Sequence, residues 1–143
     1  MKKKYLIVVA DYYKDIAKDL LDSALKLIPK SNIIKIIRVP GVFEIPITIS
    51  KNVKKYDAFL ALGCVIKGQT PHFDFISQAS TNAIMDISVV NKKPVGNGII
   101  TCLNMNQAKL RKKKGAEAAN AVNSVLSQKW KLILIQKIIQ ELL

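Results

Sequence analysis

The chain has 143 residues, of which 50% are hydrophobic, and 23 Lys and Arg against 10 Asp and Glu give it a net charge of +13. This length predicts a single domain over residues 1–143, large enough to fold without disulfides or metals, and the apolar content excludes a disordered polyelectrolyte. No apolar run approaches the roughly 18 residues of a membrane-spanning helix, so we expect a cytoplasmic protein with no membrane partner.

The first half of the chain alternates between short apolar runs and helical stripes. Residues 5–10 form a continuous apolar run of strand length, and apolar side chains at helical spacing over residues 16–28 predict a helix. Residues 32–39 predict a second strand. A helix is predicted over about residues 43–54, where Pro46 is tolerated because it lies in the first turn.

The second half continues the same alternation. A long apolar run predicts a third strand at residues 56–66, and a polar turn separates it from an amphipathic helix around residues 76–87. The remaining predicted elements are a strand at 94–103, a short helix at 104–112 and a longer helix from about residue 116.

This order predicts an α/β fold. The strands are apolar almost throughout, which indicates burial on both faces and hence a parallel sheet. We therefore expect a three-layer α/β/α sandwich with a four-stranded parallel sheet in flavodoxin-like order and helices on both faces. Ligands bind such sheets beyond the carboxyl ends of the strands, so the loops after Ala10, Val39, Ile66 and Leu103 are the candidates for a site.

The loop after the third strand carries the strongest local signal. Thr70 followed by Pro71 has the form of a helix N-cap and first helical residue. Gly68, Gln69 and Thr70 would then present backbone N–H groups to an anion at a helix start. His72 follows directly, where it is either a surface or capping residue or a proton carrier.

Candidate residues in the other loops each have a structural and a functional interpretation. Glu44 either complements a helix dipole or accepts hydrogen bonds from substrate hydroxyls. Tyr12 and Tyr13 either stack on a flat ring or cover the core. Arg111, beside the lysines at 112–114, lies either on a solvated face or in an anion clamp.

Cys64 and Cys102 are isolated in apolar runs, and the chain has one histidine. Neither cysteine has a partner at metal-ligand spacing, so we expect two reduced core thiols and no metal site.

Longer segments resemble one known family. They are Val-Pro-Gly-Val-Phe-Glu-Ile-Pro at residues 39–46 and Ala-Leu-Gly-Cys-Val-Ile-Lys-Gly-Gln-Thr-Pro-His-Phe-Asp at residues 61–74. Residues 98–101, 107–108 and 114–119 match as well. Together they resemble the lumazine synthases, the transferases of the penultimate step of riboflavin biosynthesis, and the resemblance covers essentially the whole chain.

The resemblance implies an activity and a set of site residues. Lumazine synthases condense 5-amino-6-(D-ribitylamino)uracil with 3,4-dihydroxy-2-butanone 4-phosphate, without metal or organic cofactor, to give 6,7-dimethyl-8-ribityllumazine, phosphate and water. By similarity, His72 transfers protons. The implied phosphate-binding residues are Gly68, Gln69, Thr70 and Arg111, and the implied pyrimidine and ribityl contacts are Tyr12, Val42, Phe43, Glu44, Cys64, Val65, Ile66, Asn97 and Lys114.

The resemblance also implies a homo-oligomer, by default a pentamer, with each site between adjacent subunits. Arg111, Lys114 and the loop around Asn97 would come from the neighbour. Many members of the family have an aromatic side chain where this chain has Gly96-Asn97-Gly98.

Two other functions stay open at this point. A relative that binds flavin or lumazine without turnover is compatible with the change at Asn97. A basic nucleic-acid-binding module is compatible with the charge, but nearly all of that charge is lysine, and arginine is the residue that favours bidentate recognition of phosphates and bases. Such a module also needs exposed aromatics among its lysines, and only 6% of residues are aromatic.

Overall fold

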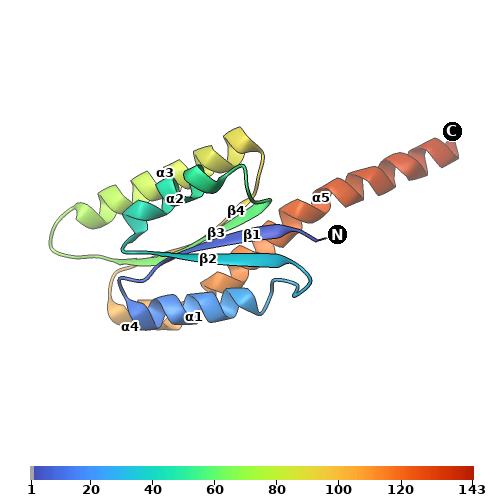
Figure 1. Cartoon of the computed structure of the whole chain (residues 1–143). Helices are drawn as coiled ribbons and strands as arrows, with labels where there is room; N and C mark the ends of the chain where they lie inside the picture. Colours follow the sequence, from blue (N-terminus) through green and yellow to red (C-terminus); the bar gives the residue numbers. More distant parts are fainter. Residues whose placement is uncertain (1) are drawn as a thin grey trace.

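Four strands form one parallel sheet. The computed structural model describes residues 2–143, apart from the side chains of residues 129–133. Strands β1 (Lys4–Ala10), β2 (Ile33–Val39), β3 (Ala58–Ile66) and β4 (Val95–Cys102) lie in the order β2-β1-β3-β4, and each neighbouring pair is parallel. The structure confirms the predicted four-stranded sheet in flavodoxin-like order (Figure 1).

Helices cover both faces of the sheet (Figure 1). One face packs against α1 (Lys14–Leu25), α4 (Met105–Leu110) and the first part of α5 (Lys114–Leu142). The other packs against the short 3-10 helix η1 (Val42–Glu44), α2 (Ile45–Asn52) and α3 (His72–Asn91). This arrangement confirms the three-layer α/β/α sandwich.

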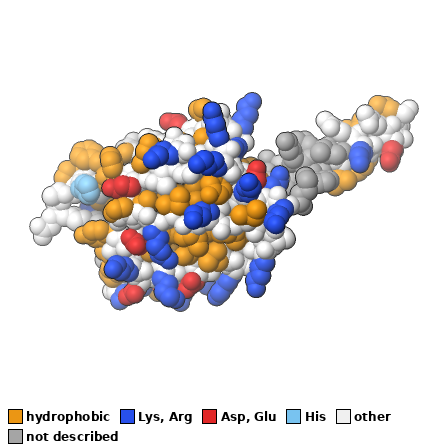
Figure 2. Space-filling view, in the orientation of Figure 1, with side chains coloured by type: hydrophobic (Ala, Val, Ile, Leu, Met, Phe, Trp, Pro, Cys, Tyr) orange, Lys and Arg blue, Asp and Glu red, His pale blue; other side chains and the backbone are white. Residues whose placement is uncertain are grey.

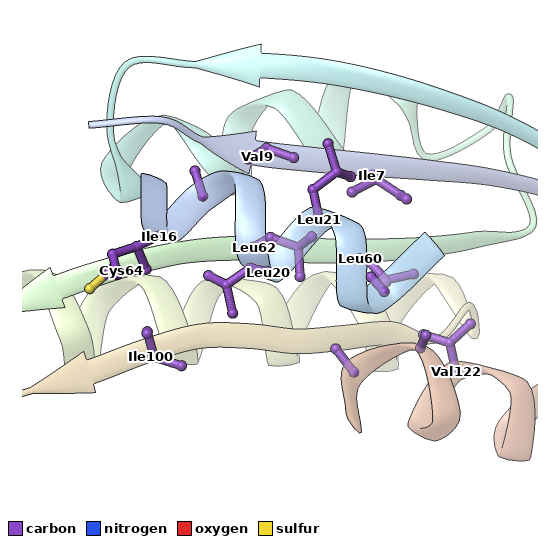
Figure 3. Packing of buried hydrophobic residues seen from close by; sticks show 14 of the residues in the cluster. Ile7, Val9, Ile16, Leu20, Leu21, Leu60, Leu62, Cys64, Ile100 and Val122 are labelled. Carbon is purple, nitrogen blue, oxygen red and sulfur yellow. The ribbon is translucent and has the colours of Figure 1, made fainter. Parts of the chain in front are cut away.

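Two apolar cores separate because successive side chains of a strand point to opposite faces. On β1, Ile7 and Val9 belong to the α1–α5 side, whereas Leu6 and Val8 belong to the α2–α3 side. Figure 3 shows the first core, where Leu20 of α1 and Val122 of α5 pack over the strands. Each fully buried Leu or Ile stabilises the fold by about 1.5–3 kcal/mol relative to leaving it exposed, so the continuous apolar runs drive the layering.

Burial on both faces holds for β1 and most of β3 but not for β2. Strand β2 lies at the edge of the sheet, and its Ile33 and Ile36 remain 42% and 36% exposed. An edge strand has a neighbour on one side only, and the covering helices pack over the central strands. The prediction that all strands are buried on both faces is therefore wrong for β2, and also for Asn97 and Thr101 of the other edge strand, β4.

Some helix boundaries also differ from the predictions. The helix expected over residues 43–54 is divided into η1 and α2, because Pro46 lacks an N–H and fits only in the first turn of a regular helix. Helix α3 begins at His72, with Pro71 as its N-cap, because the Pro71 carbonyl already accepts from the N–H groups of Asp74 and Phe75. The predicted Thr70 cap is thus one residue too early. Within the part of the chain that the structure describes, no helix has the length and apolarity to cross a membrane.

Candidate functional site

A cavity of about 600 Å³ opens at the carboxyl ends of the strands. Parallel α/β sheets bind ligands where the strand order reverses, and here that point lies between β1 and β3. The loops after β1 and β2, the end of β3 and the start of α3 all reach this cavity, which we call the switch-point cavity. Its lining residues are Tyr12, Tyr13, Gly41, Val42, Phe43, Glu44, Cys64, Val65, Ile66, His72 and Ile76.

Aromatic side chains form part of the cavity wall. Tyr12 is 75% exposed and Phe43 is 68% exposed, so both rings are free to meet a ligand. The Tyr12 ring packs edge-to-face on Tyr13, with 4.9 Å between the ring centroids. Next to Phe43, the buried Val42 anchors η1 to the core. Exposed aromatic faces of this kind suit a flat heterocycle.

Cys64 contributes a buried thiol to the same cavity. Burial, together with the neighbouring Cys102, raises the pKa of the Cys64 thiol from 9.0 to about 12. Both cysteines are free. A thiol with this pKa stays protonated at neutral pH, so Cys64 serves as an apolar wall rather than as a nucleophile.

We expect Cys64 to resist alkylation in the folded protein. In a Cys102→Ala variant Cys64 is the one cysteine left, and burial, the largest cause of its raised pKa, remains. Labelling by iodoacetamide near pH 8 should therefore be on the order of 100-fold slower in the native variant than in the same variant unfolded in urea. Mass spectrometry follows the label, and equal rates in the two states would contradict the raised pKa.

Two polar groups that suit proton transfer and hydroxyl binding reach the same cavity. His72 is the exposed first residue of α3, and its backbone N–H lies 3.5 Å from Thr70 Oγ1. Glu44 is half-buried at the end of η1. An imidazole and a carboxylate at one cavity supply a general acid–base and an acceptor for hydroxyl groups.

The turn of Gly68, Gln69 and Thr70 lies between β3 and α3 and is exposed. It is held near the end of β4 by the Lys67 N–H, which donates to the Cys102 carbonyl over 2.9 Å. Within the described residues, the backbone N–H groups of this turn donate to no other protein group. The turn therefore offers free donors beside His72, although it does not line the switch-point cavity.

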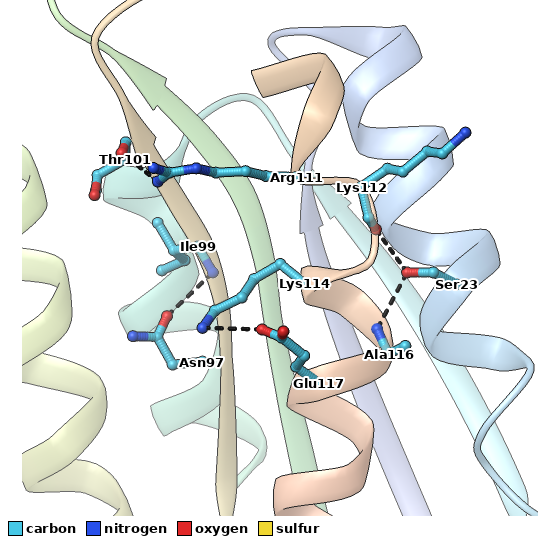
Figure 4. A network of polar contacts seen from close by, with 9 residues as sticks. All are labelled: Ser23, Asn97, Ile99, Thr101, Arg111, Lys112, Lys114, Ala116 and Glu117. Atoms are coloured by element: carbon cyan, nitrogen blue, oxygen red, sulfur yellow. Dashed lines mark hydrogen bonds and ion pairs between the residues drawn. The ribbon is translucent and has the colours of Figure 1, made fainter. Parts of the chain in front are cut away.

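The other predicted residues line a second cavity, of about 580 Å³, along β4 (Figure 4). In this β4-edge cavity, Arg111 Nη1 donates to the Thr101 carbonyl over 3.3 Å, and Lys114 Nζ lies 3.3 Å from Glu117 Oε2. The Asn97 Oδ1 atom accepts from the Ile99 N–H over 3.1 Å. The structure thus divides the predicted site, with Asn97, Arg111 and Lys114 on one side and the aromatic residues and His72 on the other.

Several lining residues lie outside the predicted site. Gly41 and Ile76 line the switch-point cavity, and Thr101, Lys113 and Glu117 line the β4-edge cavity. The sequence could have indicated Glu117, because it follows Lys114 by three residues and therefore lies on the same face of a helix. Packing explains the glycine at position 96, because a Cβ there would lie 2.5 Å from the Ala118 carbonyl oxygen of α5.

On the face seen in Figure 2, the positive charge does not form one stripe. Figure 2 shows Lys and Arg side chains scattered between apolar patches over the visible face. Among the residues that the structure describes, no group of three or more His, Cys, Asp and Glu side chains is placed to hold a metal ion.

Comparison with known proteins gives a consistent result. Residues 2–129 match the model of the family described as 6,7-dimethyl-8-ribityllumazine synthase. The Cutibacterium acnes protein of that name is 38% identical over 133 residues, which cover 87% of this chain and 80% of that protein. The Rhodopseudomonas palustris 6,7-dimethyl-8-ribityllumazine synthase 1 is 39% identical over 142 residues, which cover 90% of this chain and 87% of that protein.

A third relative, from Methylorubrum extorquens and also named 6,7-dimethyl-8-ribityllumazine synthase, is 41% identical over 139 residues, or 88% of this chain and 80% of that protein. The match spans all four strands and both cavities. The chain therefore belongs to the 6,7-dimethyl-8-ribityllumazine synthase family.

Proposed function

We propose that the chain condenses 5-amino-6-(D-ribitylamino)uracil with 3,4-dihydroxy-2-butanone 4-phosphate to give 6,7-dimethyl-8-ribityllumazine, phosphate and water. The supporting observation is the switch-point cavity, which combines exposed aromatic rings with His72 and Glu44 and lies within the residues that match the family. The substrates are small molecules, no cofactor is used, and each subunit is one domain that works in the cytoplasm.

The residues of the switch-point cavity suit the steps of this reaction. The pyrimidine ring stacks on Tyr12, and Glu44 accepts hydrogen bonds from the ribityl hydroxyls. The pyrimidine amine attacks the ketone, and loss of water leaves an imine. Elimination then breaks the C–O bond to phosphate, and ring closure releases a second water. His72 takes up and returns the protons in these steps, because its imidazole can both accept and donate a proton.

The division of the site supports an assembly in which two copies share each site. The free N–H groups of Gly68, Gln69 and Thr70 would hold the phosphate. Arg111, the other residue proposed to bind the phosphate, lies in the β4-edge cavity of the same chain. We infer that the β4-edge cavity of one subunit faces the switch-point cavity of its neighbour in a pentamer. The neighbour would then contribute Arg111, Lys114 and Asn97 to the site.

Arg111→Ala is expected to raise the KM for the phosphate substrate by about 10–100-fold, the scale of a charge-assisted hydrogen bond to an anion. The KM for the pyrimidine should stay near its native value. Steady-state kinetics with each substrate varied in turn measures both. Arg38→Ala is the matched control, because Arg38 is an exposed arginine on the edge strand β2. A change confined to the pyrimidine KM would contradict the assignment.

The activity itself is tested by mixing the purified protein with both substrates. Lumazine absorbance and released phosphate should rise together, faster than in the spontaneous reaction. Tight lumazine binding without acceleration would instead assign the chain to the non-catalytic flavin and lumazine binders, and strong salt-sensitive DNA binding would favour the nucleic-acid module.

A further inference from the structure

The end of α5 projects beyond the sheet (Figure 1). Among the described side chains of α5, Ala118, Ala119, Val122 and Leu126 pack in the apolar core on the α1 side of the sheet. Residues 134–143 lie past these contacts and also past residue 129, where the match to the family model ends. We call residues 134–143 the projecting segment, and its surface is separate from both cavities.

The projecting segment is amphipathic. Apart from the terminal Leu143, its apolar side chains recur at positions i, i+1, i+4, i+5 and i+8, which places these five on one side of a helix. The five are between 51% and 80% exposed, although such a stripe normally packs on a core. These residues, which we call the apolar stripe, are Leu134, Ile135, Ile138, Ile139 and Leu142.

The charges of the segment bear on which partner could cover the stripe. Lys137 and Glu141 are its charged side chains, one of each sign, in a chain of net charge +13. A helix that lies on an anionic membrane or on nucleic acid carries a row of basic residues opposite its apolar face. Here that side consists of Gln136, Lys137, Gln140 and Glu141. A neutral partner with a matching pair of opposite charges fits better, and a second copy of the segment is such a partner.

We propose that the projecting segments of two copies pair antiparallel, with their apolar stripes in contact. On the helix, Lys137 and Glu141 lie on the same flank of the stripe. In an antiparallel pair with two-fold symmetry like flanks meet, so Lys137 of each copy lies beside Glu141 of the other copy. A parallel pair brings the charged flank against the uncharged one and forms neither contact. This pairing is independent of the proposed enzyme activity.

Sedimentation of the full chain tests the pairing. The native assembly is expected to have about twice the mass of a double variant with Ile135→Gln and Ile138→Gln, which keeps the helix and removes the stripe. The matched control carries Gln136→Ser and Gln140→Ser in the same turns on the opposite side, and it should keep the native mass. Equal masses for the native chain and the stripe variant would overturn the proposal.

Carbodiimide coupling tests the orientation. In a mixture of isotopically labelled and unlabelled chains, antiparallel pairing yields cross-linked Lys137–Glu141 peptides that carry one label. These peptides should disappear in the stripe variant and persist in the control. Flotation with phosphatidylglycerol vesicles tests the alternative partner, an anionic membrane surface. Vesicle binding that the stripe variant abolishes, at unchanged mass, would overturn the pairing and assign the segment to a membrane surface.

Discussion

His72→Ala is expected to lower the turnover number by about 10²–10⁴-fold, the usual contribution of a positioned general acid–base group. His72 is the one histidine of the chain and lines the cavity that also holds Tyr12 and Glu44. Imine formation and phosphate elimination both need a group that gives and takes protons. Single-turnover kinetics at saturating substrate measures the loss directly.

The same variant should bind the pyrimidine substrate with near-native affinity, because the contacts proposed for Tyr12 and Glu44 remain. Asp74→Asn is a suitable control. Asp74 lies in the same turn of α3 and is exposed, but it does not line the switch-point cavity. We expect its turnover to stay native. A native turnover number for His72→Ala would show that another group carries the protons.

Gly115→Ala is expected to destabilise the fold by about 3 kcal/mol, at the upper end for overpacking. Gly115 lies in the first turn of α5, where the helix meets α1, and a Cβ there would overlap the Leu20 carbonyl oxygen. That oxygen belongs to the backbone, so it cannot rotate away. Ser23 holds the same junction, because its Oγ donates to the Lys112 carbonyl over 2.8 Å and accepts from the Ala116 N–H over 3.1 Å.

Urea denaturation measures the change in the free energy of unfolding, and the sign of that change tests the close packing of α1 and α5. In a helix without such a neighbour, Gly→Ala stabilises by up to about 1 kcal/mol through helix propensity. A more stable Gly115→Ala variant would therefore show that α1 and α5 are not this close. Gly68→Ala is the control, because a Cβ on Gly68 meets no atom within 4 Å. Its midpoint should stay native.

The fold was predictable because its signals are local. The apolar runs that became β1 and β3 and the stripe that became α1 follow directly from burial and period. The exposure of β2 was not predictable in this way, because its run around Ile36 looks like that of a central strand. Only the strand order, which depends on contacts between distant segments, places it at the edge.

The switch-point cavity was predictable because a parallel sheet gathers the loops that follow its strands at one edge. The motif at residues 39–46 and the segment around His72 were therefore expected to meet. That Arg111 lies along β4 was not visible from the residues themselves, because it depends on how α4 and α5 turn back onto the sheet. Only the family resemblance suggested that Arg111 serves a different copy.

The family itself was predictable from two long motifs and is confirmed by the match over residues 2–129. The projecting segment lies outside that match, and residues 134–143 were predicted only as the continuation of a long helix. Their unburied stripe becomes apparent once the structure shows that the side chains of these residues are exposed.

In the proposed assembly, the two cavities of one chain are halves of two different sites. Coexpression of His72→Ala and Arg111→Ala chains tests it, assayed at a phosphate-substrate concentration far below the KM of the Arg111 variant. If adjacent subunits share each site, about a quarter of the sites in random mixed rings contain both native residues. Recovery of roughly that fraction of the native rate is therefore expected. A rate no higher than the average of the two variants assayed separately would contradict it.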